Sequence, residues 1–292
     1  MSLTTWTAKA STIPPGLPVA RALPVAARRT IGPFCFLDHF GPFDVGGERG
    51  MQVGPHPHVG LQTVTWLFEG ALAHRDSLGS EQRVQPGELN LMTAGDAGVV
   101  HSERTPDDAP PRMHGVQLWT ALPATDGTMP ADFEHHAALP RRQANGADLC
   151  VFLGRLDDLA SPATLHTPGY GAELRLEAGA ELVLPVDPTH EHGVFVVEGT
   201  VDGTFALGDV GAMAHHAPGP SRLEFRSGTG ARLILVGGAP FRARVHMWWN
   251  YVALDREPIR RAAADWAAGR RFGAVPGDDG PRIEGPSLPE AY

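Results

Sequence analysis

The chain has 292 residues, of which 42% are hydrophobic and 20% charged, so it has enough apolar residues for either one large or two modest globular domains. Its formal net charge of −9 argues against binding to nucleic-acid phosphates or anionic membranes, because those partners require clustered Lys and Arg. No apolar stretch approaches the ~18 residues of a membrane span, and we expect a cytoplasmic protein.

The part of the chain before residue 122 is predicted to form an all-β domain. Residues 1–30 are rich in Pro, Ala and Thr, which favours an extended lead-in over a helix. Short apolar segments such as LQTVTWLFEG (61–70) then alternate with Gly, Pro and Asp turns, as in a sandwich or barrel. Cys35 and Cys150 are far apart and lack C-x-x-C spacing, so we expect reduced, buried thiols.

The second half repeats this pattern after an irregular, polar connection at residues 122–147. We therefore predict two domains, 1–134 and 135–292, and the segments LFEG (67–70) and VVEG (196–199) form a weak internal repeat. Near the end of the chain, Pro258, apolar residues at helical spacing and Gly269 predict one amphipathic helix, followed by a surface tail.

Four side chains form the candidate metal site, namely His56, His58, His101 and Glu103. Alternate side chains of a strand share one face, so the two members of each pair point to the same side. Three imidazoles and a carboxylate suit Fe, Mn, Co, Ni, Cu or Zn, whereas Ca and Mg prefer oxygen ligands. Open positions on a six-coordinate ion would favour iron. The alternative is that these histidines are ordinary core or surface residues, as a single His on a strand more often is.

The spacing of these residues resembles the two motifs of the cupin superfamily. The first motif runs from His58 through Thr63 to Gly70, with Thr63 where cupins usually place a Glu ligand, and Gly98 and His101 match the second. Glu103 would replace the lost carboxylate, which is the substitution made by the pirin branch. Further segments resemble pirins, the last two bacterial pirins in particular: LDHFGPF (37–43), HRDSLGS (74–80), LMTAGDAGVVHSE (91–103), HGVQLW (114–119), MWWNYV (247–252) and GRRFGAVPGDDGPRI (269–283).

The resemblance to the pirin family implies a fold and two alternative functions. The fold is a bicupin, with two β-barrel (jelly-roll) domains, a metal in the N-terminal one, and a short C-terminal helix and tail. One function is quercetin 2,3-dioxygenase activity, in which a flavonol bound to Fe(II) is opened by dioxygen and Glu103 serves as ligand or base. The alternative is a non-enzymatic, redox- or metal-responsive regulator that binds a protein partner. A storage or sugar-isomerase cupin fits the placement of Glu103 poorly.

Other histidines receive weaker assignments. His190 and His192 imitate the first pair, but counting back from Gly199 places His192 where Thr63 lies in the first half. We therefore expect a surface or pocket feature there rather than a second metal. His39 and His74 could line a cavity or contact a ligand, although stabilisation of a turn is the expected role.

Overall fold

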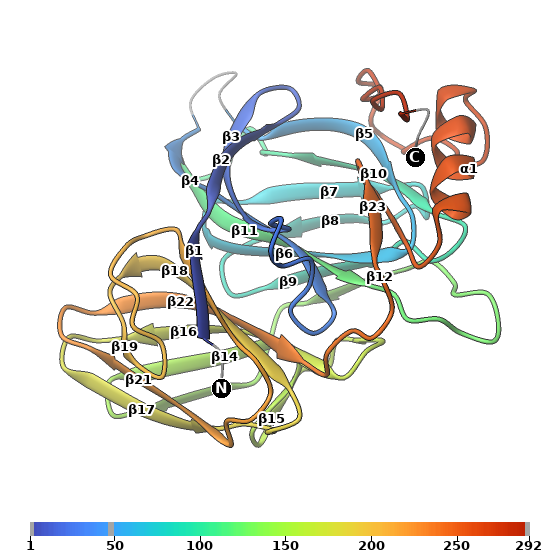
Figure 1. Ribbon diagram of the computed structural model, residues 1–292. Coiled ribbons are helices and arrows are strands. Elements are labelled where there is room, and N and C mark those ends of the chain that lie inside the picture. Colours follow the sequence, from blue (N-terminus) through green and yellow to red (C-terminus); the bar gives the residue numbers. More distant parts are fainter. Residues whose placement is uncertain (1–2, 46–49, 290–292) are drawn as a thin grey trace. The chain divides into compact units, whose positions relative to one another are not determined.

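The computed structural model describes residues 3–45 and 50–289, and in this part of the chain it contains 24 β-strands and one α-helix (Figure 1). The chain divides into two compact units that alternate along the sequence. Unit 1 comprises Met1–Ala10, Ala20–His39 and Ala138–Arg242, and unit 2 comprises Ser11–Val19, Phe40–Ala137 and Ala243–Tyr292. The all-β prediction is confirmed, whereas the predicted single boundary between residues 134 and 135 stays a prediction.

Unit 2 contains a four-stranded sheet of order β5-β10-β7-β8 (Figure 1). Its strands are β5 (Gln52–His58), β10 (Val99–Arg104), β7 (Leu72–Asp76) and β8 (Glu81–Val84). β5 lies at the edge of this sheet, where Pro55 and Pro57 are tolerated because an edge strand need not donate on both sides. The two prolines alternate with His56 and His58, so the histidines share the opposite face of β5.

A second sheet has the order β12-β9-β6-β11-β4-β3-β2. Its strands are β12 (Asp132–His136), β9 (Leu89–Thr93), β6 (Leu61–Glu69), β11 (Arg112–Ala121), β4 (Phe34–Asp44), β3 (Leu17–Leu23) and β2 (Lys9–Ile13). The central strand β6 is buried along all but its last residue, so both of its faces are covered. In unit 2 a core that includes Leu67, Leu72 and Met113 joins residues of the two sheets.

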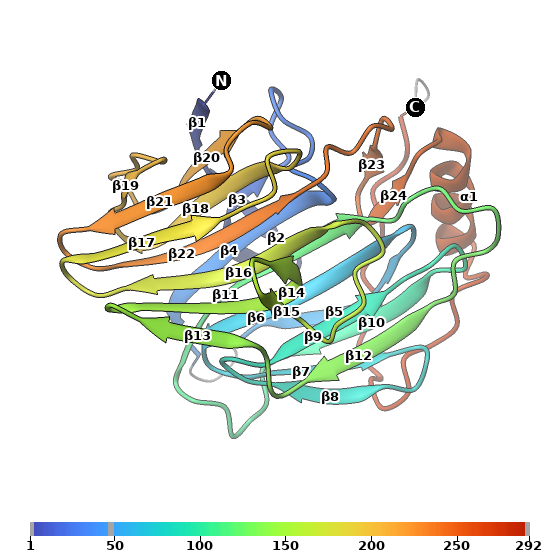
Figure 2. The same cartoon turned by 90° about the horizontal axis from the view of Figure 1, so that it is seen from below.

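Unit 1 contains the other barrel-like pair of sheets (Figure 2). The larger sheet has the order β1-β20-β18-β22-β16-β14-β13 with β15 paired to β14, and the smaller one has the order β17-β21-β19. Their strands are β1 (Leu3–Thr7), β13 (Arg141–Ala144), β14 (Ala147–Leu156), β15 (Leu159–Ala160), β16 (Gly169–Leu176), β17 (Ala180–Pro185), β18 (Glu191–Gly199), β19 (Asp202–Gly203), β20 (Ala212–His216), β21 (Arg222–Ser227) and β22 (Ala231–Gly238). Phe225, Leu174 and Val196 belong to the core between them. The second β-barrel predicted from the sequence is confirmed.

The irregular connection predicted over residues 122–147 is partly wrong. This stretch carries β12, which pairs with β9, and β13, which pairs with β14. Both strands lie at the edge of a sheet, and most of their residues are half-buried or exposed. Edge strands with solvent on one side need few apolar residues, so the alternation that reveals a strand in the sequence is absent here.

The predicted C-terminal helix is confirmed as α1 (Arg256–Ala267), which follows the hairpin β23 (His246–Trp248) and β24 (Tyr251–Ala253). Asp255 caps the helix by accepting backbone N–H groups of its first turn, and Ile259, Ala262 and Trp266 are buried as their spacing predicts. Of the helices in the described chain, none is long and apolar enough to cross a membrane.

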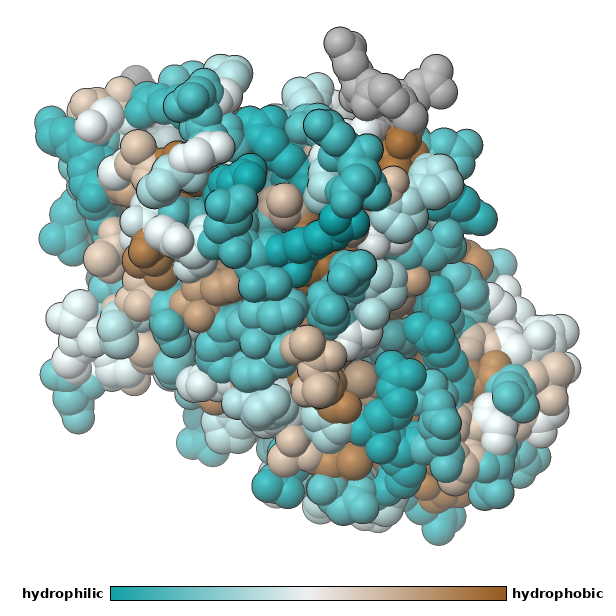
Figure 3. Space-filling model, turned by 180° about the vertical axis from the view of Figure 1, so that it is seen from behind, coloured by the Kyte–Doolittle hydropathy of each residue, from teal (hydrophilic) through white to brown (hydrophobic). Residues whose placement is uncertain are grey.

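The tail after α1 is largely exposed, as predicted, but it is anchored at several points. Phe272 and Val275 are buried in a cluster with Trp266, and Asp278 forms an ion pair with Arg104. Residues 290–292 of the tail lie outside the described part of the chain. The face of the molecule in Figure 3 is mainly hydrophilic, with apolar residues interspersed. In the described ranges the exposed large apolar side chains are Leu3, Leu78, Val183 and Val210.

Candidate metal centre

Polar side chains from three adjacent strands gather on one face of the four-stranded sheet. They are His56 and His58 from β5, His101 and Glu103 from β10, and His74 and Asp76 from β7. His101 lies opposite His56 on one side and opposite Asp76 on the other, while Glu103 lies opposite His74. Residues directly opposite each other in an antiparallel pair share a face, so the register itself brings these side chains together.

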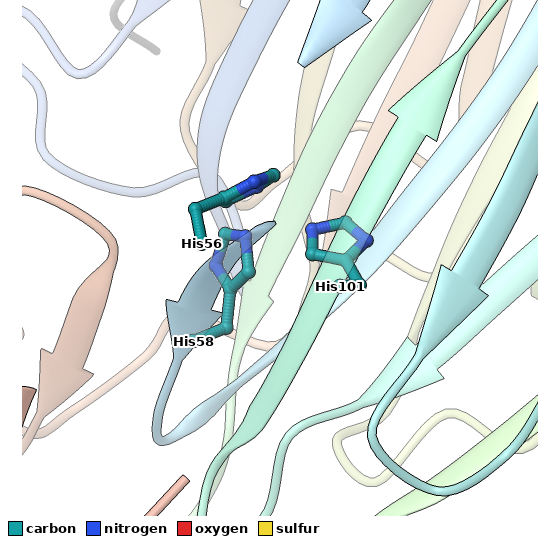
Figure 4. Close-up of side chains that lie close together, drawn as sticks. All are labelled: His56, His58 and His101. Carbon is teal, nitrogen blue, oxygen red and sulfur yellow. The ribbon is translucent and has the colours of Figure 1, made fainter. Parts of the chain in front are cut away.

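The imidazoles of His56, His58 and His101 point toward one another (Figure 4). The ring centroid of His101 lies 4.3 Å from that of His56 and 4.8 Å from that of His58, and each ring offers a nitrogen within 4.8 Å of those of the others. Three of the four side chains predicted from the sequence are therefore close together in the structure. Three imidazole nitrogens at this separation can surround one ion.

The protonation of these rings suits metal binding. Burial lowers the pKa of His56 to about 4, although a hydrogen bond from its Nδ1 to the carbonyl of Gly54 (2.8 Å) acts in the opposite direction. Burial, together with the charge of the neighbouring histidines, also places the pKa of His58 and of His101 well below the usual value. All three rings are therefore neutral at pH 7, which is the form of histidine that binds metals.

Two ring nitrogens in this cluster are buried and have no hydrogen-bond partner among the described residues. Neither Nδ1 of His58 nor Nε2 of His101 has a hydrogen-bond partner within residues 3–45 and 50–289. A buried polar atom that gives up water without gaining a partner costs about 1–3 kcal/mol, so native proteins rarely keep one without a reason. The donor set, the burial and the unpartnered ring nitrogens together fit a bound transition-metal ion.

Glu103 lies beside His101 on the side of His74, and these three residues form a second group whose ligand atoms lie within 4.8 Å of one another. Burial raises the pKa of the Glu103 carboxyl, and a hydrogen bond from the Thr65 hydroxyl (3.1 Å) opposes that change. Thr63, at the position where cupins usually carry a Glu ligand, is buried on β6. The two groups share His101, but Glu103 is grouped with His74 and not with His56 or His58.

An irregularity in β5 shapes this face. The register shifts by one residue between the pair His101–His56 and the pair Glu103–Val53, which leaves one additional residue in β5. Gly54 lies in this bulge, its carbonyl accepts the hydrogen bond from His56, and a Cβ at position 54 would come within 2.6 Å of the Pro281 carbonyl. Bulges of this kind re-aim side chains, and here the bulge directs the ring of His56 toward His101.

His74 makes more contacts in this cluster than its sequence context indicates. Asp76, two residues further along, stabilises the following turn, because its Oδ1 accepts the backbone N–H groups of Leu78 (2.9 Å) and Ser80 (3.0 Å). However, Oδ2 of Asp76 accepts a hydrogen bond from His74 Nε2 (2.9 Å), and His74 faces the ligand cluster. The alternation His74-x-Asp76 was the available signal, since it repeats the pattern of His56-x-His58. His39, by contrast, is buried beside Phe195 in unit 1.

His190 and His192 in unit 1 are arranged differently from His56 and His58. His192 is buried on β18 and hydrogen-bonds to the hydroxyl of Tyr170 (2.7 Å), so of the predicted surface or pocket feature the surface alternative is wrong for this residue. His190 lies 3.7 Å from Asp187 and lines a cavity of about 670 Å³. In the described ranges, the groups of three or more residues that could hold a metal are the two in unit 2.

Comparison with known proteins places the chain in a family. The family model "Pirin" matches residues 16–120, and the model "Pirin C-terminal cupin domain" matches residues 171–273, which together exceed half of the chain. The chain belongs to the pirin family. This pirin is 42% identical over 285 residues to a Pseudomonas aeruginosa protein whose name assigns it provisionally to quercetin 2,3-dioxygenase, covering 97% of this chain and 90% of that protein.

Two further comparisons support the family and the fold of this pirin. A pirin-like protein from Caulobacter vibrioides is 37% identical, with 86% of this chain and 88% of that protein covered. The structure also matches a crystal structure of quercetin 2,3-dioxygenase from Acinetobacter baumannii, with a TM-score of 0.93 and 37% sequence identity. This match covers 99% of this chain and 96% of the Acinetobacter chain. The predicted bicupin fold and the predicted family are therefore confirmed.

Proposed function

We propose that this pirin holds one divalent transition metal through His56, His58, His101 and Glu103. The observation that carries the proposal is the pair of buried ring nitrogens, Nδ1 of His58 and Nε2 of His101, that have no hydrogen-bond partner in the described chain. The three neutral imidazoles and the carboxylate match a borderline first-row ion. Fe(II) is the expected ion, with Mn, Co, Ni, Cu or Zn as substitutes.

We further propose that the metal protein is a quercetin 2,3-dioxygenase that acts on a flavonol or a similar small aromatic substrate. The relatives that are named for this activity, at 42% and 37% identity over nearly the whole chain, support the substrate class. When bound, the metal would acidify a substrate hydroxyl and supply the redox chemistry needed for reaction with dioxygen. One dioxygen would be consumed and one carbon monoxide released for each flavonol opened.

The pKa shifts of the four proposed ligands indicate which of them would accept a proton in this reaction. Burial raises the pKa of Glu103 and lowers those of His56, His58 and His101, so a proton that enters the cluster resides on the carboxylate rather than on a ligating ring. Glu103 is therefore the group that would take the hydroxyl proton of the substrate. The hydroxyl of Thr65, on β6, orients this carboxylate through its hydrogen bond.

One observation favours a second candidate function. The four proposed ligand side chains are only 1% to 8% exposed, which suits a closed site. Loss of one electron would add a unit of charge to this buried centre, and such a change can alter a neighbouring surface. The second candidate is thus a non-enzymatic, redox- or metal-responsive regulator that binds a protein partner in the cytoplasm.

An oxygen-uptake assay decides between the two candidates. Protein loaded anaerobically with a measured amount of Fe(II) is mixed with quercetin, air is admitted, and oxygen consumption and carbon monoxide are followed. We expect turnover by the wild type and a loss of about 10²- to 10⁴-fold in Glu103→Gln, the range for removal of a general base. His136→Ala is the matched control, because His136 pairs with Glu134 on β12 outside the two candidate metal groups. Loaded protein that consumes no oxygen would favour the regulator, and protein that binds no metal would overturn both candidates.

A further inference from the structure

Three buried side chains form a continuous chain of hydrogen bonds that ends at a proposed ligand. Oδ2 of Asp76 lies 2.9 Å from Nε2 of His74, and Nδ1 of His74 lies 3.2 Å from Nδ1 of His101. The ring of His74 is also held by stacking on Phe133 of β12, with 4.5 Å between centroids. All of the links lie within unit 2, and Asp76, His74 and His101 are buried.

The hydrogen-bond capacity of each group determines where the protons lie. The Asp76 carboxylate only accepts, and its Oδ1 already receives two backbone N–H groups, so Nε2 of His74 must be the donor to Oδ2. In its neutral form His74 has a single N–H, which then lies on Nε2 and leaves a lone pair on Nδ1. That lone pair must accept the hydrogen bond from Nδ1–H of His101.

This assignment leaves the lone pair of His101 on Nε2. The same atom is the buried nitrogen without a hydrogen-bond partner in the described ranges, and one ring nitrogen of His101 faces His56 and His58 in Figure 4. His56 is fixed in the corresponding way, because its Nδ1–H donates to the carbonyl of Gly54 and its Nε2 is left as the acceptor. Each of these two rings therefore keeps its lone pair on Nε2.

We propose that Asp76 and His74 are positioning residues that set the tautomer of His101 and so prepare its Nε2 for the metal. This inference rests on the proposed metal site. The carboxylate also increases the electron density on His101 through the intervening ring, which strengthens it as a ligand. His74 is thus a supporting residue, although its distance to Glu103 and His101 would also permit direct ligation.

The substitution Asp76→Asn should reverse the direction of the hydrogen bonds in the chain Asp76–His74–His101, which we call the relay. The shape of the side chain at position 76 hardly changes. The two backbone N–H groups of Leu78 and Ser80 require an oxygen, so the amide must place its carbonyl there and turn its NH₂ toward His74. Nε2 of His74 then accepts, its Nδ1 donates, and His101 is forced to carry its proton on Nε2. An amide in place of a carboxylate that orients a histidine is known to select the wrong tautomer in this way.

The first measurement needs no metal. In protein with ¹⁵N-labelled histidine, long-range ¹H–¹⁵N correlation spectra report which ring nitrogen of His101 is protonated. We expect Nδ1–H in the wild type and Nε2–H in Asp76→Asn. Asp96→Asn is the control, because Asp96 also accepts a backbone N–H (from Met129, 2.8 Å) but makes no contact with the relay in the interactions described. An Nε2–H tautomer of His101 in the wild type would overturn the inference, whatever the metal affinity.

The second measurement is the affinity for Zn(II), from competition with a chromophoric chelator. We expect Asp76→Asn to bind Zn(II) about 10- to 100-fold more weakly than the wild type and Asp96→Asn to be unchanged. If Asp76→Asn does not fold, His74→Phe, which preserves the stacking on Phe133, should weaken Zn(II) binding to a similar degree. Equal affinities of the folded variant and the wild type would refute the relay.

Two outcomes separate this inference from the proposed function. A wild type that shows Nδ1–H on His101 but binds no Zn(II) would preserve the relay and reject the metal site. Conversely, a metal-shifted ¹⁵N resonance of His74 in the Zn(II)-loaded protein would show that His74 is itself a ligand. That result would keep the metal function and overturn the positioning role.

Discussion

The ion pair between Arg104 and Asp278 is expected to stabilise the strand that carries the proposed ligands. Arg104 follows Glu103 on β10, and its Nε and Nη2 donate to the two carboxylate oxygens of Asp278 at 2.6 Å and 2.8 Å. Asp278 also accepts the backbone N–H of Gly280, and its side chain is only 3% exposed. The C-terminal tail is thereby fastened to β10 within unit 2.

The structure gives the size of this contribution. Hydrogen bonds from Arg104, opposed by burial and assisted by Ser102 and Gly280, lower the pKa of Asp278 from 3.8 to about 2. Since one pKa unit corresponds to about 1.36 kcal/mol, the interactions of the ionised carboxylate contribute about 2 kcal/mol to stability at neutral pH. The folded-state pKa is depressed, so this stability is present above pH ~3.8 and is lost as the pH falls toward ~2.

Urea denaturation of the wild type, Asp278→Asn, Arg104→Gln and the double variant measures the pair directly. We expect Asp278→Asn to lose about 2 kcal/mol in the free energy of unfolding at pH 7 and the two substitutions to be clearly non-additive. The control is Asp108→Asn, because Asp108 accepts from Arg83 at similar distances but is 76% exposed, and no resolvable loss is expected. Additivity of Asp278→Asn and Arg104→Gln within about 0.5 kcal/mol would refute the reasoning.

Three further predictions concern other parts of the chain. Replacing both His190 and His192 by Ala should leave about one metal per chain by elemental analysis, and a fall from two to one would establish a second site. Burial lowers the pKa of His39 from 6.5 to about 4. Because the unfolded chain takes up a proton at His39 over this range and the folded protein does not, the free energy of unfolding should fall by up to about 3 kcal/mol between pH ~6.5 and ~4. The stability difference between wild type and His39→Asn, from urea denaturation, should therefore narrow over this range, and a constant difference would contradict the argument. Gly60→Ala should lower the melting temperature more than Gly79→Ala. Both glycines have a positive φ, but only at position 60 would a Cβ meet a backbone carbonyl, that of Val252 in β24 at 2.0 Å. Equal decreases in melting temperature would show that a small shift relieves this contact.

Local chemistry in the sequence was sufficient for several features. The alternation of His56 with His58, and of His101 with Glu103, predicted which side chains share a face because the period of a strand is fixed at two. The C-terminal helix could also be predicted from the sequence, because the apolar spacing and the helix stop at Gly269 are local signals. Strands β12 and β13 were missed because polar edge strands lack the apolar alternation by which strands are recognised.

Which strands lie next to each other depends on long-range pairing in the fold. The pairing of β10 with β7 places His74 opposite Glu103 and brings Asp76 into the chain of hydrogen bonds that ends at His101. The contact of Arg104 with Asp278 joins residues 174 positions apart. The sequence by itself determined the face on which each ligand lies, because that follows from backbone geometry within one strand. It did not determine the register between strands, because register depends on long-range pairing and on bulges such as the one at Gly54, which no local pattern specifies.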